Sequence, residues 1–350
     1  MYESKLALGL TPYTAGEQPK DRKFIKLNTN ENPYPPSPRV AEAIAGLADN
    51  LRLYPDMEAT CLREAIAQVN GVTPEQVFCG NGSDEVLAFA FAAFFAGKTL
   101  LAPDITYSFY PVYSQLFDVT YCTVALKEDF TVDVDDLLQG CPIALANPNA
   151  PTGIFLPLEE VRRMAAHCKE HGEVLLVDEA YAAFSAENAL PLLQEYDNLL
   201  IVRTFSKSHA LAGMRVGYAM GAPRLIQAMR CIRDSFNSYP LDLLAQAGAT
   251  AAVLDTAYTE KAVGMVVEAR DACRDALRAA GIPVLESRTN FLFVKADPED
   301  ASRVQQALRN EGILVRHFGA PRLKPWLRVT VGTLEDMQKV TEALIRLIRG

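Results

Sequence analysis

The chain carries, at residues 203–218, the stretch RTFSKSHALAGMRVGY, and this stretch decides the fold. In it Lys207 follows a small hydroxyl residue, Ser206, and stands eight residues before Arg215, which has a glycine two residues away on either side. A lysine amine can form a Schiff base with an aldehyde, and a serine hydroxyl and an arginine can both contact a phosphate. Glycines let the backbone approach a ligand closely. The stretch indicates a lysine beside a phosphate site, although a lone lysine is more often a solvated surface residue.

A carboxylate upstream complements this lysine. Asp178 lies 29 residues before Lys207 and follows the apolar run 174–177, which predicts a short buried strand. Ligands of open α/β sheets bind outside the carboxyl ends of the strands. An acid at that place can keep a pyridine nitrogen protonated, which makes the ring an electron sink. The two residues together indicate pyridoxal 5'-phosphate as the cofactor, unless Asp178 merely ends a strand at a turn.

Two further segments supply polar groups between predicted elements. Residues 146–153 read ANPNAPTG, an irregular turn whose side-chain amides face inward or cap locally. Residues 79–85 read CGNGSDE and lead into an apolar helix pattern, for which Ser83 is the predicted N-cap. The free amides of such a helix terminus bind phosphate well. A dinucleotide-binding fingerprint is rejected, because Glu85 occupies the place of its third glycine.

With these segments in view, the sequence resembles the fold-type I, class I and II aminotransferases, and among them most closely the histidinol-phosphate aminotransferases. The resemblance runs over nearly the whole chain. Besides residues 203–218, it is carried by LTPY (10–13), LNTNENPYP (27–35), RLYPD (52–56), GNGSDE (80–85), TY (106–107), NPNAPTG (147–153), DEAY (178–181), GILVR (312–316) and LRVTVGT (327–333). The lysine and aspartate segments mark the superfamily, whereas NENP, LYPD and the final LRVTVGT narrow it toward this family.

The resemblance implies a role for each residue around the cofactor ring. Lys207 would be the Schiff-base lysine and, once displaced by substrate, the base that moves the proton. Asp178 would pair with the pyridinium nitrogen. Asn149 and Tyr181 would hydrogen-bond the ring's 3-oxygen, and Tyr107 would stack on the ring face.

It also implies a phosphate site and a partner subunit. The backbone amides of Ser83 and Asp84, together with Ser206 and Arg215, would hold the cofactor phosphate. Tyr54 would reach that phosphate from a second copy of the chain, so the resemblance implies a homodimer.

The substrate prediction depends on anionic groups. By resemblance, Arg328 would grip an α-carboxylate in a bidentate fork, and Arg316 with the hydroxyl of Tyr13 would complete a second anion grip. Two arginines suit both L-histidinol phosphate and glutamate, which must bind in the other half-reaction. The alternative for Arg316 is that it ends an edge strand in solvent.

Three other functions remain open at this point. An aromatic amino-acid aminotransferase and a threonine-phosphate decarboxylase use the same scaffold, and which bond breaks depends on fine geometry. A regulator that senses pyridoxal phosphate would need a DNA-binding domain before the site. Only about 25 residues precede Leu27, so a regulator is disfavoured.

Composition favours an ordinary globular enzyme. The chain has 350 residues, 49% of them hydrophobic and 22% charged, and a formal net charge of −9, which argues against nucleic-acid or membrane-surface partners. Its seven cysteines include no C-x-x-C pair, and no signal peptide or membrane span is visible, so we expect a cytoplasmic protein. His167 and His171 could share a helix face as zinc ligands do, but a solvated face is favoured and no metal is expected.

Alternating patterns predict an α/β fold. Between about residues 40 and 235, helices alternate with short apolar strands (143–146, 174–177, 199–202 and 216–220), which predicts a mainly parallel sheet. Beyond residue 240, helices at 241–254, 258–280, 301–310 and 334–348 and strands at 290–294, 313–315 and 327–331 predict a smaller α+β part. We expect a large cofactor-binding domain at 30–255 and a small domain formed by 1–29 and 256–350, with the cofactor in the cleft between them.

Overall fold

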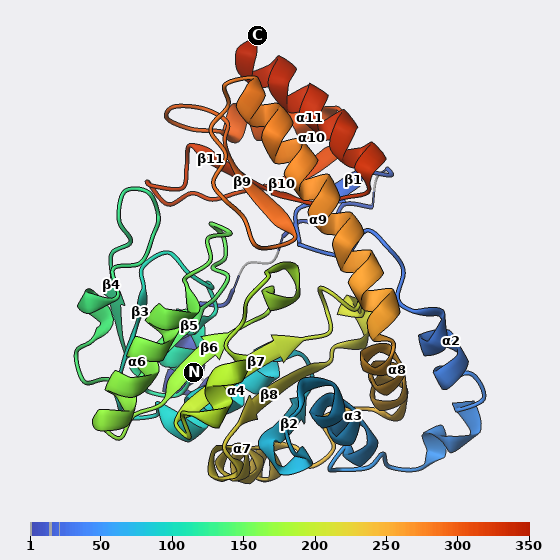
Figure 1. Cartoon of the computed structure of the whole chain (residues 1–350), viewed down its shortest axis with the longest axis vertical. Helices are drawn as coiled ribbons and strands as arrows, with labels where there is room; N and C mark the ends of the chain where they lie inside the picture. The colour runs from blue at the N-terminus through green and yellow to red at the C-terminus, as the bar shows by residue number, and fades with distance from the viewer. Residues whose placement is uncertain (1, 14–15, 21) are drawn as a thin grey trace.

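The computed structural model describes residues 2–13, 16–20 and 22–350, which form two β-sheets covered by helices (Figure 1). The larger sheet has seven strands and the smaller has four. In spatial order the larger sheet contains β2 (Val77–Gly80), β8 (Gly217–Gly221), β7 (Leu199–Thr204), β6 (Leu175–Asp178), β5 (Ile143–Ala146), β3 (Thr99–Pro103) and β4 (Thr120–Val124). The smaller contains β1 (Ile25–Leu27), β10 (Ile313–His317), β11 (Trp326–Thr330) and β9 (Phe291–Lys295).

The larger sheet is mainly parallel, as predicted. Strand β8 runs antiparallel to both of its neighbours, and β7, β6, β5, β3 and β4 pair in parallel. The strands β5, β6 and β7 therefore end at one edge of the sheet. The predicted α/β fold class is confirmed.

Helices cover both faces of this sheet because its strands are apolar on both sides. Leu175 and Val177 of β6 pack into the hydrophobic cluster that contains α3 (Thr60–Asn70), α6 (Leu158–Glu170) and α8 (Leu243–Leu254). Leu176, between them, points to the opposite face. That face is covered by α4 (Ser83–Phe94), α5 (Tyr110–Leu116) and α7 (Pro223–Phe236).

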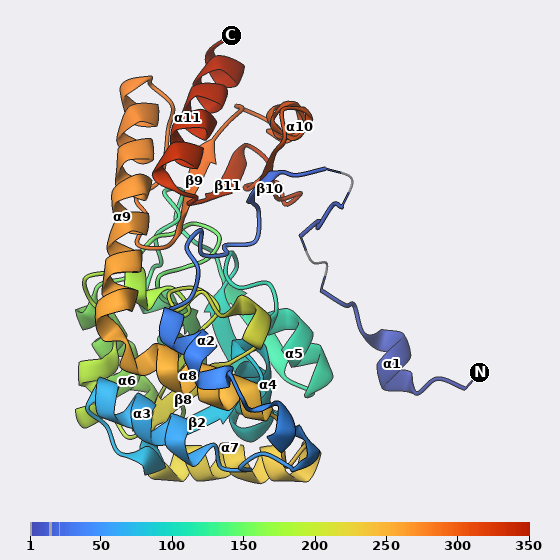
Figure 2. The ribbon, with the colours of Figure 1, turned by 90° about the vertical axis from the view of Figure 1, so that its right-hand side faces the viewer.

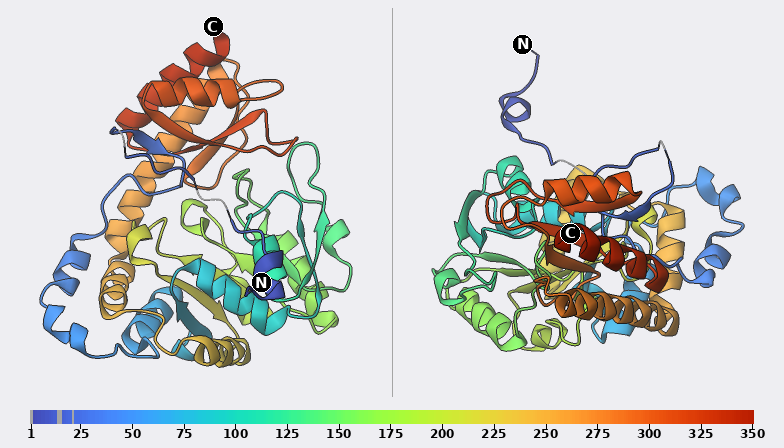
Figure 3. Two further views of the ribbon diagram at one scale, coloured as in Figure 1. Left: turned by 180° about the vertical axis from the view of Figure 1, so that it is seen from behind. Right: turned by 90° about the horizontal axis from the view of Figure 1, so that it is seen from above.

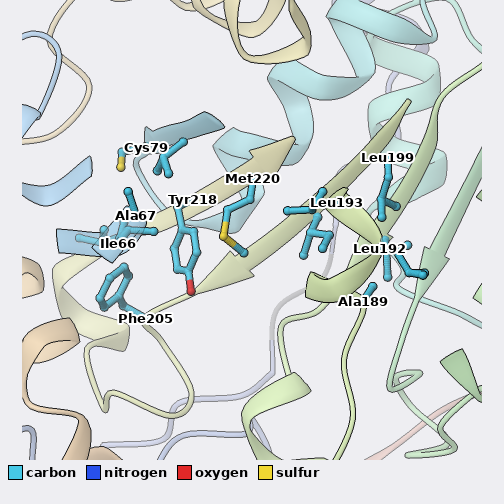
Figure 4. Close-up of a cluster of buried hydrophobic side chains, with 14 of the residues drawn as sticks. Ile66, Ala67, Cys79, Ala189, Leu192, Leu193, Leu199, Phe205, Tyr218 and Met220 are labelled. Carbon is cyan, nitrogen blue, oxygen red and sulfur yellow. The ribbon is translucent and has the colours of Figure 1, made fainter. Parts of the chain in front are cut away.

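Figure 4 shows part of the first cluster, where Met220 and Tyr218 of β8 lie near Phe205 and Ile66. Ile66 and Met220 are fully buried. Each such side chain contributes roughly 1.5–3 kcal/mol. The sheet that carries the site is therefore held rigidly from both sides.

The N-terminal segment returns to the small sheet, as expected from the sequence. Strand β1 pairs in parallel with β10, nearly 290 residues away in the chain. Helices α9 (Thr256–Ala279), α10 (Ser302–Asn310) and α11 (Leu334–Arg349) complete this part, and Figure 1 shows α9 running alongside both halves of the molecule. The domain boundaries themselves stay a prediction, and residues 1, 14, 15 and 21 of the predicted small domain lie outside the described residues.

Short helices complete the description. Helix α1 (Lys5–Gly9) buries none of its residues and stands away from the body in Figure 2, whereas α2 (Pro38–Ile44) packs against α8. The right-hand view in Figure 3 shows the same separation of the N-terminal segment. Single 3₁₀ turns occur at Ala48–Arg52, Pro74–Gln76, Asp135–Leu137, Ala182–Phe184, Leu190–Gln194 and Ala212–Met214. None of the helices in the described ranges is both long enough and apolar enough to span a membrane.

One local prediction is wrong. The N-cap of α4 is Gly82, with φ +89°, and Ser83 is the first helical residue. Glycine is favoured there because its left-handed conformation turns the chain sharply from β2 into the helix. The amides of the first turn consequently face open space without a side-chain cap.

Candidate active site

A cavity of about 410 Å³ lies at the edge where β5, β6 and β7 end. This is the place where parallel sheets bind ligands. Ala146, Asp178 and Thr204, which end these three strands, all line it. Of the predicted site residues, the cavity brings together Ser83, Asp84, Tyr107, Asp178, Tyr181, Ser206, Lys207 and Arg215.

Lys207 stands in the loop that follows β7. Its amine donates a hydrogen bond to the carbonyl oxygen of Thr29 at 3.3 Å and lies 5.9 Å from the centre of the Tyr181 ring. Burial, and secondarily the positive charge of Arg328, lower the pKa of Lys207 to about 8. A substantial fraction of this amine is therefore neutral, and so nucleophilic, near physiological pH.

Asp178 ends β6 and is 5% exposed. Its carboxylate accepts hydrogen bonds from the Ala180 amide at 3.1 Å and from the Tyr110 hydroxyl at 3.4 Å. Burial raises the pKa of Asp178 to about 7, against the effect of the Ala180 hydrogen bond. A cationic ring nitrogen beside this carboxylate would offset the cost of burying its charge, so the site fits a pyridinium.

The N-terminus of α4 forms an anion site with Arg215. The guanidinium donates to the Ser206 hydroxyl at 3.4 Å and to the Asp84 carboxylate at 3.2 Å. A β-carbon on Gly82 would lie 2.6 Å from the guanidinium, and one on Gly217 would lie 2.3 Å from the Ser83 nitrogen. Both glycines are thus required for the close approach of arginine, strand and helix terminus. Such a cradle suits a phosphate.

Tyr107 and Tyr181 stand between this cavity and a second one, because both side chains line each cavity. The Tyr107 hydroxyl donates to Asp84 at 2.6 Å. Burial raises the pKa of both phenols, so each keeps its proton and can act as a hydrogen-bond donor.

Asn149 is buried behind the first cavity, between its lining residues Pro148 and Ala150. Its side-chain nitrogen donates to the Ile105 carbonyl and to the Thr152 hydroxyl, both at 3.0 Å. Its Oδ1 has no hydrogen-bond partner within the described part of the chain. Asn149 Oδ1 therefore remains available to accept a hydrogen bond, whereas the side-chain N–H groups are already engaged.

The second cavity, of about 440 Å³, brings together Tyr13, Arg316 and Arg328. The two arginines face each other in register on β10 and β11. Arg328 donates to the Asn28 carbonyl at 3.2 Å, and its Nε is buried with no partner among the residues described. Burial, with a contribution from Arg316, lowers the pKa of Arg328. Two adjacent guanidinium groups in one cavity favour an anionic ligand.

The alternative for Arg316 is wrong. Strand β10 is paired on both sides, and Arg316 is only partly exposed.

The second cavity also contains a carboxylate, that of Asp104. It lies 3.6 Å from Arg322 and forms an ion pair with it.

Tyr54 is not brought to either cavity. Its side chain is 82% exposed and stacks on Tyr239 with the ring centres 4.7 Å apart. His209, two residues after Lys207, lines neither of these cavities. Its ring packs 4.7 Å from that of Phe205 beside a separate, smaller cavity, and burial lowers its pKa to about 4.

No role was predicted from the sequence for the segment from Asn28 to Asn32, which lies beside the first cavity. Thr29 and Glu31 line the first cavity, and Asn30 donates to the Tyr181 hydroxyl at 2.8 Å. Tyr110, which bonds Asp178, was also missed. The run NTNEN was visible as a family marker, but its contacts join residues 150 to 300 positions apart, and no local pattern reports them.

The comparisons with known proteins agree with this geometry. The sequence profile described as aminotransferase class I and II matches residues 22–344. The chain is 51% identical over 344 residues to the histidinol-phosphate aminotransferase of Acetobacter pasteurianus, covering 97% of this chain and 96% of the relative. It is 49% identical over 338 residues to that of Gluconacetobacter diazotrophicus, covering 96% and 94%.

A solved structure is similar over nearly the whole chain. The histidinol-phosphate aminotransferase of Sinorhizobium meliloti, in complex with pyridoxal-5'-phosphate, superimposes with a TM-score of 0.89 at 27% identity, covering 99% of this chain and 98% of that one. The chain therefore belongs to the class I and II aminotransferases, and within them to the family of the histidinol-phosphate aminotransferases.

Proposed function

We propose that this protein uses pyridoxal 5'-phosphate to transfer the amino group of L-histidinol phosphate to 2-oxoglutarate, giving imidazole acetol phosphate and glutamate in histidine biosynthesis. The observation that carries the proposal is the adjacency of two cavities, one with Lys207 and Asp178 and one with two arginines, which share the walls Tyr107 and Tyr181. The names of the relatives and the cofactor in the Sinorhizobium meliloti structure support it.

The first cavity fits the cofactor. Lys207 would bind its aldehyde, Asp178 its ring nitrogen, and Tyr107 and Tyr181 would contact the ring. The amides of Ser83 and Asp84, with Ser206 and Arg215, would hold its phosphate. When bound, the cofactor supplies an electron sink that stabilises negative charge at the substrate carbon bearing the amino group.

Lys207 performs the proton transfer. Its amine, neutral in part because burial lowers its pKa to about 8, takes the proton from the carbon that bears the substrate's amino group. Asp178 would stabilise positive charge on the ring nitrogen of the bound cofactor, and the Tyr110 hydroxyl holds that carboxylate in place. The buried walls exclude water from this proton transfer.

Arg328, Arg316 and Tyr13 select the substrates. In L-histidinol phosphate they bind the phosphate, and in glutamate or 2-oxoglutarate they bind carboxylates. An arginine fork suits both groups, because each presents two or more oxygens in one plane. A transaminase that moves an amino group in two steps must bind the amino donor and the amino acceptor at the same place.

The same assignment extends to the oligomeric state, the domain boundaries and the cellular location of the protein. We propose a homodimer in which Tyr54, exposed in the single chain, reaches the cofactor phosphate of the partner subunit. We also propose that residues 30–255 form the cofactor-binding domain, that 1–29 and 256–350 form the small domain, and that the protein is cytoplasmic.

A half-reaction tests the function. The purified protein, loaded with pyridoxal phosphate, is mixed separately with L-histidinol phosphate, L-phenylalanine and L-threonine phosphate, and the visible absorbance of the cofactor is followed. We expect rapid bleaching with histidinol phosphate, at a rate at least tenfold above that with phenylalanine. Faster bleaching with phenylalanine would favour an aromatic aminotransferase, and release of carbon dioxide from threonine phosphate would favour a decarboxylase.

A further inference from the structure

Asn30 occupies an unusual position between the two sheets. Its backbone has φ +55°, in the left-handed region, and the residue is 2% exposed. Asparagine tolerates this conformation better than most residues. Its backbone is held from the small sheet, because its amide donates to the Thr330 hydroxyl at 3.0 Å and its carbonyl accepts from the Asn290 side chain at 3.1 Å.

The hydrogen-bond network determines which way the Asn30 side chain points. The Thr330 hydroxyl donates to Asn30 Oδ1 at 3.0 Å, and Asn30 Nδ2 donates to the Tyr181 hydroxyl at 2.8 Å. Exchanging the two atoms of the amide would leave the proton of Thr330, a residue 1% exposed, without its acceptor. A buried donor without an acceptor costs about 1–3 kcal/mol. The amide nitrogen therefore faces Tyr181.

This orientation decides what the Tyr181 hydroxyl can do. A phenol carries one proton, and its oxygen already accepts from Asn30, so the proton is available to a different acceptor. Tyr181 lines the first cavity, and its ring packs edge-on against Phe291 with the centres 5.2 Å apart, which restricts its movement. The hydroxyl is thus presented to the cavity as a donor.

We propose that Asn30 is a positioning residue that keeps the Tyr181 hydroxyl donating toward the ring oxygen of the cofactor. The inference rests on the transamination proposed above and adds a residue to it. A donor on that oxygen withdraws electron density from the conjugated system and so lowers the pH at which the bound cofactor loses its proton. Asn30 acts on this property through Tyr181, without touching the cofactor.

The same segment lies close to the substrate side. Thr330 stands two residues after Arg328 on β11, and Arg328 donates to the Asn28 carbonyl, two residues before Asn30. The position of Asn30 is therefore fixed by the strand that carries the substrate arginine. Asn290 provides a control, because its side chain anchors the Asn30 backbone carbonyl and takes no part in the hydrogen bonds of the Asn30 side chain.

The test compares Asn30→Asp with Asn290→Ala in the cofactor-loaded protein. Aspartate keeps the size of asparagine but has no amide donor, so the Tyr181 proton turns to the new carboxylate and the cofactor oxygen loses it. We expect the midpoint of the pH-dependent change in visible absorbance to rise by about one pH unit, with kcat reduced and KM little changed. Asn290→Ala should lower the thermal stability and leave the midpoint in place.

Two results would overturn the inference. One is an Asn30→Asp midpoint equal to that of the wild type, and the other is an equal shift in Asn290→Ala, which would make the effect merely structural. In a Tyr181→Phe background, Asn30→Asp should cause no additional shift, since the hydroxyl is gone.

The cofactor-free protein separates this inference from the proposed function. There, Tyr181→Phe should move the NMR signals of the Asn30 side-chain amide and leave those of Asn198 unchanged, because Asn198 donates to Ala165 and Glu173 at a distant place. Unmoved Asn30 signals would contradict the hydrogen bond itself. A wild-type protein that binds cofactor but does not convert histidinol phosphate would contradict the proposed function and leave the spectral test of Asn30 intact.

Discussion

The two cavities contain buried charges of different kinds. In the first, burial brings the pKa of Lys207 down to about 8 and that of Asp178 up to about 7, so both groups can change charge near neutral pH. In the second, Arg316 and Arg328 keep their charge, because a guanidinium does not lose its proton in proteins. The difference indicates that the first cavity performs proton transfer and the second binds anions.

The largest effect is expected at the lysine. Lys207→Ala should lower kcat for histidinol phosphate by about 10⁴-fold or more, because both the covalent link and the proton transfer are lost. Steady-state turnover of the purified variant is the measurement, and Lys261→Ala, at an exposed lysine, is the control. Near wild-type turnover in Lys207→Ala would remove the first cavity from the chemistry.

Asp178→Asn should separate catalysis from stability. We expect about a 10³-fold loss of kcat, since the ring nitrogen loses its counter-charge, an effect of roughly 4 kcal/mol. The stability of the cofactor-free protein should change in the opposite direction. The folded pKa, about 7, lies above the ordinary value of 3.8, so the folded carboxyl binds more protons between these two values. The free energy of unfolding consequently falls as pH rises from about 4 to 7.

Urea unfolding at pH 5 and pH 8 measures this slope. In Asp178→Asn, the free energy of unfolding should fall less between pH 5 and pH 8 than it does in the wild type. The variant should therefore be more stable than the wild type at pH 8. Asp49→Asn, at an exposed position, should leave the decline as it is. A wild-type protein equally stable at both pH values would show that the Asp178 carboxyl is not strained by burial.

The arginine pair should affect binding more than chemistry. Arg328→Met should lower kcat/KM for histidinol phosphate about 100-fold, or roughly 2.7 kcal/mol, which is within the range for removing one partner of a buried, hydrogen-bonded charge pair. Arg316→Met should cost about tenfold, because Tyr13 and Arg328 remain. If either variant lowered kcat and left KM unchanged, the second cavity would take part in the chemical step, which would contradict its assignment to anion binding.

The smallest effect concerns loading of the cofactor. Because only the neutral Lys207 amine reacts with an aldehyde, the loading rate of the cofactor-free protein should rise with pH and level off above about 8. Stopped-flow absorbance between pH 6 and 10 measures it. A rate that still increases steeply above pH 10 would indicate an amine with an ordinary lysine pKa.

The local patterns predicted the first cavity better than the second. Lys207, Ser206 and Arg215 lie in one stretch, and Asp178 ends the neighbouring parallel strand, so sheet topology suffices to bring them together. By contrast, Tyr13 comes from the N-terminal segment and Arg316 and Arg328 from the C-terminal part, and their proximity depends on the return of β1 to β10. Resemblance to a family, and not a local pattern, indicated the roles of the arginines.

The sequence by itself determined the α/β class, the order of the strands and helices, the residue types at the end of each strand and the family. These depend on local periodicity and short motifs, which physical chemistry links directly to structure. Only the tertiary structure decided that Gly82 and not Ser83 is the N-cap of α4, that His209 lies away from the site, and that Asn30 faces Tyr181. Those facts arise from packing between residues far apart in the chain, where burial and hydrogen-bond satisfaction, and not local preference, determine the result.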